Sequence, residues 1–99
     1  MTRSEVKNYL HVDISEDDRM IDTMMEAAEE FIVAAVGDYD EGKARAQMLF
    51  LAVVQDMYDN RTFVASSTQG YSVSEAKRHM INSMITQLQL EYDMEQPEG

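Results

Sequence analysis

The stretch from Lys43 to Asn60 contains neither Gly nor Pro and carries seven consecutive apolar residues, Met48 to Val54. Such a run fits either a buried strand or the buried part of a helix. Its Ala, Leu and Met content favours a helix. A helix that is apolar nearly all round belongs at the centre of a fold. The chain therefore needs other helices to pack around this one.

Two of those helices are predicted in the first third of the chain. Residues 2–10 are predicted to form a short helix, because Thr2 and Glu5 have the spacing of a capping box. A longer helix is predicted to follow a cap at Ser15. Apolar residues recur in it every three or four positions until Gly37, a residue well suited to end a helix.

The last helix is predicted to begin at a second capping box, Ser72 with Glu75. Residues 62–71 before it are rich in Ser, Thr and Gly, and they predict a long loop or a short hairpin. We expect one small all-α domain over residues 1–92, with one short helix and three longer ones. Residues 93–99 are acidic and include the only proline, so we expect a flexible tail.

The charge is strongly and unevenly negative. The chain has 19 acidic and 8 basic side chains, for a net charge of −11, and residues 13–41 hold eleven acids and one base. Binding to phosphates or to anionic lipid requires clustered Lys and Arg, so we expect neither specific nucleic-acid binding nor membrane binding. The apolar runs are far shorter than the roughly 20 residues of a membrane span. Without an apolar leader we expect a cytoplasmic protein.

Residues that carry chemistry do not form a recognisable catalytic pattern. The lack of cysteine excludes thiolate metal sites and disulfides, and no phosphate-binding glycine loop or nucleophile elbow is present. Glu75 and His79 have the spacing of a metal pair, but a third ligand is not evident. We therefore expect no enzymatic activity, no metal and no cofactor.

Carboxylates occupy the side of the second helix opposite its apolar stripe: Asp22, Glu26, Glu29 and Glu30. Such a face is usually solvated. Its density also suits a surface that repels nucleic acid or imitates it. One hypothesis is therefore an acidic helical binding module, a DNA mimic that blocks a host DNA-binding protein.

Four short segments together resemble the phage head–tail connector family, the small helical adaptors that join a portal ring to the tail. They are residues 6–13, 27–32, 57–61 and 81–88, within a resemblance that covers about residues 4–90. The most specific is Met57-Tyr58-Asp59-Asn60-Arg61, although Met57 stands where many members have an aromatic residue. The proline that leads into the last helix of many members is also missing, which leaves the loop geometry there open.

The resemblance implies a structural role without catalysis. It implies a homo-oligomeric ring on the portal protein, in the neck of the virion, that extends the channel through which DNA passes. A further head-completion or tail protein would be the second partner. We expect assembly in the host cytoplasm, with residues 62–71 and 91–99 ordered only in the assembled particle. Whether the isolated subunit is a monomer stays open.

Candidate interface residues follow from the same comparison and cluster around the end of the third helix: Tyr58, Asn60, Arg61, Phe63, Val64 and Tyr71. For Asn60 and Arg61 two roles remain open. They cap the helix or form an ion pair within the subunit, or they contact a neighbouring subunit or the portal. The acidic residues Asp22, Glu26, Glu29 and Glu30 would line the channel or lie on the surface.

Overall fold

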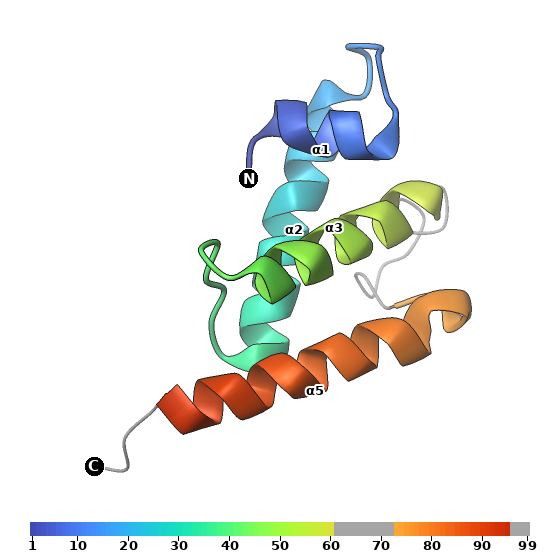
Figure 1. The fold of residues 1–99 in the computed structure, drawn as a ribbon. Coiled ribbons are helices and arrows are strands. Elements are labelled where there is room, and N and C mark those ends of the chain that lie inside the picture. Colours follow the sequence, from blue (N-terminus) through green and yellow to red (C-terminus); the bar gives the residue numbers. More distant parts are fainter. Residues whose placement is uncertain (61–72, 96–99) are drawn as a thin grey trace.

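The computed structural model describes residues 1–60 and 73–95 (Figure 1). Within these residues the chain is helical and contains no strand, which confirms the all-α class. The elements, in chain order, are α1 (Arg3–Leu10), α2 (Asp18–Val36), α3 (Ala44–Asp59), the 3-10 helix η1 (Glu75–Lys77) and α5 (Arg78–Glu95).

The short first helix starts as its sequence predicts. The Thr2 hydroxyl accepts a hydrogen bond from the Glu5 backbone N–H (3.2 Å), and the Glu5 carboxylate accepts one from the Thr2 N–H (3.0 Å). The capping box is therefore confirmed. Val6 is fully buried and fixes α1 against α2 and α3, because a helix of eight residues needs tertiary packing to persist.

The ends of α2 agree with the sequence at one terminus only. The predicted side-chain cap at Ser15 is wrong: α2 is preceded by Asp17, and no side chain caps it. The backbone carbonyl of Ser15 instead accepts the Asp18 N–H (3.1 Å) in a tight turn. At the other end Gly37 stops the helix with φ +111°, as predicted, and donates its N–H to Val33 O.

The apolar run of residues 48–54 lies in α3, the central helix, which packs against α1, α2 and α5 (Figure 1). The helical interpretation of this run is therefore confirmed. Leu49, Val53 and Val54 are fully buried, whereas Met48 is 61% exposed. Figure 1 shows α5 along one side of the molecule, with α2 crossing both α3 and α5. This arrangement buries the core between the three longer helices.

The start of α5 is reached through η1. Ser72 of the predicted capping box lies outside the described residues, and the residue before η1, Ser74, makes no capping bond with its side chain. The last helix then continues to Glu95, three residues past the predicted boundary at residue 92. The acidic tail beyond it stays a prediction. No helix in the described part of the chain has the length and hydropathy to cross a membrane.

Candidate assembly surfaces

A buried carboxylate organises the end of α3, where the candidate interface residues gather. Asp56 is 1% exposed and is the only buried charged residue in the described part of the chain. Its carboxylate accepts a hydrogen bond from the Ser74 backbone N–H (3.0 Å) and another from the Ser74 hydroxyl. Asp56 therefore ties the last turn of α3 to the start of η1.

Asn60 closes α3 as its C-cap. Its side-chain amide donates to the backbone carbonyl of Asp56 (2.9 Å) and lies 3.4 Å from the Asp56 carboxylate. These bonds satisfy acceptors near the helix end, where carbonyls have no partner within the helix. The capping role that the sequence left open for Asn60 is thus present, and its role in an interface stays a prediction.

Tyr58 joins the end of α3 to the start of α2. Its hydroxyl donates to the Asp17 carboxylate at 2.7 Å, and its ring is half-buried against the core. The structure therefore brings Tyr58 and Asn60 to the same end of α3, with contacts inside the subunit. The other candidate interface residues, Arg61, Phe63, Val64 and Tyr71, lie outside the described residues.

The acidic residues predicted on α2 all lie on its exposed side: Asp22, Glu26, Glu29 and Glu30. We call this surface the acidic face. Asp22 is paired with Arg3 (2.8 Å), but the three glutamates form no ion pair within the described residues. Together with Val33, which is 43% exposed, they line a shallow depression. Three of the four carboxylates of the acidic face are thus unpaired within the described residues, and they lie beside an exposed apolar side chain.

Asp18 connects α1 to α2 through two cations. Lys7 Nζ donates to its carboxylate at 2.6 Å, and Arg3 Nε lies 3.8 Å away. The hydrogen bond from Lys7 is the main reason that the pKa of Asp18 lies below its ordinary value, and Arg3 adds to the effect. These pairs hold the short α1 in place.

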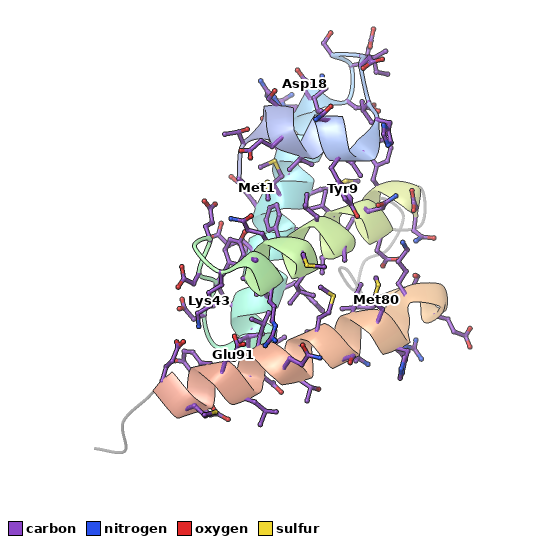
Figure 2. All side chains as sticks on the ribbon, in the orientation of Figure 1. Met1, Tyr9, Asp18, Lys43, Met80 and Glu91 are labelled. Atoms are coloured by element: carbon purple, nitrogen blue, oxygen red, sulfur yellow. The ribbon has the colours of Figure 1, made fainter. Side chains whose placement is uncertain are left out.

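Two ion pairs join α3 and its approach to the end of α5: Lys43 with Glu95 (2.6 Å) and Arg45 with Glu91. The hydrogen bond to Glu95 raises the pKa of Lys43. Figure 2 shows Lys43 and Glu91 near one end of α5, with Met80 near the other. Charged groups therefore secure one end of α5, and Asp56 secures the other.

Among the described residues, no three His, Asp and Glu side chains lie close enough together to hold a metal ion. Sequence reasoning missed Asp56. The signal in the sequence was the position of Asp56 one turn after Val53, which places it on the buried side of the helix.

Comparison with known proteins identifies the family. A family model described as phage gp6-like head-tail connector protein matches residues 1–91 of the 99-residue chain. Neither the search of curated proteins nor that of solved structures found a match. The matched range takes in α1, α2, α3, η1 and most of α5, so it covers the whole helical core. The chain belongs to the phage gp6-like head-tail connector protein family.

Proposed function

We propose that this protein forms a ring on the portal of a tailed bacteriophage or prophage, where it extends the DNA exit channel and joins head to tail. The observation that carries the proposal is the family match over residues 1–91. The partners are the portal protein on one side and a further head-completion or tail protein on the other. The site of action is the virion neck, after assembly in the host cytoplasm.

The charge of the chain suits a channel through which DNA slides. Each copy has a net charge of −11, so a ring of copies presents a strongly negative wall to the DNA phosphates. Four of the cations, Arg3, Lys7, Lys43 and Arg45, are already paired with carboxylates of the same chain. Among the described residues only Arg19, Lys77 and Arg78 are left without an ion pair, too few beside 19 acidic side chains for DNA to be retained.

The surface also carries apolar side chains that a single copy leaves open. Leu90 is 60% exposed and Met94 is 85% exposed, both on α5, and Ile14 before α2 is 53% exposed. A chain of 99 residues forms only a modest hydrophobic core. Burial of these exposed apolar side chains against neighbouring proteins therefore adds stability. The portal would supply a template, because copies with a charge of −11 repel one another in solution.

Co-sedimentation with the assembled portal, at about 0.15 M salt, tests the proposal. The portal encoded near this protein is the appropriate partner. We expect saturable binding near one copy per portal subunit. A folded protein that fails to bind the portal at any salt concentration would contradict the proposal.

A second function, imitation of DNA, is favoured by one observation. Glu26, Glu29 and Glu30 form an exposed row of carboxylates without cationic partners in the described residues. A DNA mimic would bind a host DNA-binding protein in competition with DNA and would need no oligomer. Competition in a host lysate, together with failure to bind the portal, would select this function over the connector.

A further inference from the structure

Most cations in the described part of the chain are engaged within the subunit. Of the seven described Lys and Arg residues, four form ion pairs, and the remaining three are Arg19, Lys77 and Arg78. Lys77 and Arg78 are adjacent, at the junction of η1 and α5. With Glu75 they give residues 75–79 a charge of +1 in a chain whose total is −11. We call Lys77 and Arg78 the basic corner.

The basic corner also has an exposed apolar neighbour. Met80 is 45% exposed, and Figure 2 shows it near the start of α5. The acidic face has a similar composition with the opposite charge, because Glu26, Glu29 and Glu30 line a depression together with the exposed Val33. Interfaces between proteins commonly combine an apolar centre with complementary charges at its edge. The two surfaces are therefore complementary in both charge and polarity.

The two surfaces lie on different sides of one copy. Glu26 and Glu29 share a depression with Glu41, which belongs to the connection between α2 and α3. Figure 1 shows this connection at one side of the molecule and the start of α5 at the opposite side. Contact between the two surfaces therefore joins different copies head to tail, and a head-to-tail contact that repeats can close into a ring.

We infer that the basic corner of each copy docks against the acidic face of the next copy in the ring. Lys77 and Arg78 would pair with Glu26, Glu29 and Glu30, and Met80 would pack near Val33. The inference rests on the proposed connector function and specifies which surfaces its subunits use. It places the acidic face between copies and leaves other surfaces to line the channel.

Local attraction can exist beside overall repulsion because the two act over different distances. The Debye length is about 8 Å at 0.15 M salt, so charges spread over two whole subunits are largely screened from one another. Pairs within about 4 Å at a partly desolvated contact are screened much less. The contact therefore operates at physiological salt despite a net charge of −11 on each copy.

Disulfide cross-linking on the portal tests the inference directly, since the natural chain has no cysteine. In the variant Glu30→Cys/Arg78→Cys, we expect oxidation of the portal-bound protein to yield a ladder of covalent oligomers. Glu30→Cys and Arg78→Cys alone should yield only monomers, because a head-to-tail contact does not bring identical residues together. Portal-bound protein that yields no ladder from the double variant would overturn the inference.

Charge reversal provides an independent test in the co-sedimentation assay. The variant Lys77→Glu/Arg78→Glu should bind the portal roughly tenfold more weakly than the natural chain. Adding Glu26→Lys/Glu30→Lys exchanges the two charges and should restore binding. The matched control compares two single charge reversals that change the net charge equally. Arg78→Glu should weaken binding to the portal, whereas Arg19→Glu should not. Circular dichroism verifies that each variant is folded.

The outcomes separate the inference from the function on which it rests. If the natural chain does not bind the portal, the connector function is wrong and the inference fails with it. If the natural chain binds the portal but the charge-reversed variants bind equally well, the connector function is supported and the assigned contact between copies is wrong. Weakened binding that the exchanged variant restores supports both.

Discussion

The carboxylate of Asp56 accepts the backbone N–H of Ser74 at 3.0 Å, and this bond joins the last turn of α3 to the residue before η1. The two residues are 18 positions apart, and the chain between them includes residues 61–72, which the structure does not describe. Asp56 is 1% exposed, so its bonds operate largely out of water. It thereby sets where α5 starts and how the basic corner is held.

Replacing Asp56 should therefore destabilise the fold. The variant Asp56→Ala removes an acceptor of several hydrogen bonds and leaves the Ser74 N–H without that partner. We expect the free energy of unfolding to fall by about 1.5–3 kcal/mol, the range for hydrogen bonds to charged groups. Urea denaturation measures it. Ser74→Ala, which deletes only the hydroxyl donor, should cost less, and equal stability of Asp56→Ala and the natural chain would contradict this role.

Gly37 cannot be replaced without strain. Its φ is +111°, and a Cβ at this position would lie 2.9 Å from the ring of Tyr92 on α5. Gly37→Ala should lower the free energy of unfolding by about 1–2 kcal/mol, the usual cost of a left-handed conformation for a residue with a Cβ. The control Gly42→Ala meets only the flexible Asp40 side chain. Comparable losses in both variants would show that the special backbone of Gly37 is not the cause.

The hydroxyl of Tyr39 is buried and has no hydrogen-bond partner within the described residues, while its ring stacks on Phe50. Burial, with Glu41 and Glu29 nearby, raises the pKa of Tyr39 from 10.0 to about 12. The pKa of Tyr39 is higher in the folded protein than in the unfolded chain. Its contribution to the free energy of unfolding is therefore fully present below pH 10.0 and is lost as the pH rises toward 12. The ionisation of Tyr39 should therefore appear as a late step, near pH 12, in an ultraviolet absorbance titration.

Tyr39→Phe provides the control for this assignment. It retains the stacked ring and removes a buried hydroxyl that lacks a partner, so stability at neutral pH should be unchanged or higher by up to about 1 kcal/mol. The late step of the titration should disappear in this variant. A late step that persists would assign it to another tyrosine.

The bond between Tyr58 and Asp17 offers a test of where Tyr58 acts. Tyr58→Phe removes the 2.7 Å hydrogen bond to the Asp17 carboxylate and should cost about 1 kcal/mol of stability. A double-mutant cycle with Asp17→Ala should show coupling of similar size. Unchanged stability with weakened binding to the portal would instead support the interface role predicted from the sequence.

Assembly on the portal should have an optimum in salt concentration. Raising the salt from about 0.01 M to about 0.15 M shortens the Debye length from about 30 Å to about 8 Å and weakens repulsion between copies. Near 1 M the length is about 3 Å, and the pairs made by Lys77 and Arg78 also weaken. Sedimentation across this range should show maximal binding at intermediate salt. Binding that only falls with salt would contradict the repulsion between copies.

Most of the fold could be predicted from the sequence, because the signals that specify the helices are local. The Thr2–Glu5 capping box, the stop at Gly37 and the apolar run in α3 each depend on residues within one or two turns. The exact end of α5 could not be predicted from the sequence, because Glu95 is paired with Lys43, 52 residues away. Likewise, the missing side-chain cap at Ser15 reflects a backbone turn that replaces it.

The candidate assembly surfaces could be predicted only in part from the sequence. Helical periodicity alone placed the acidic face on the exposed side of α2, where the structure has it. The bonds of Asp56 to Ser74 and of Tyr58 to Asp17 span 18 and 41 residues, so they depend on how the helices pack. The basic corner could be recognised only from the structure, which shows that Arg3, Lys7, Lys43 and Arg45 are paired within the chain.

The central claim, that this protein joins head to tail, is tested most directly by removing it from the phage that encodes it. Electron microscopy of lysates should then show DNA-filled heads and separate tails, with complete particles restored when the natural protein is supplied in trans. Supplying Lys77→Glu/Arg78→Glu should restore far fewer. Complete, infectious particles formed without the protein would contradict the connector function.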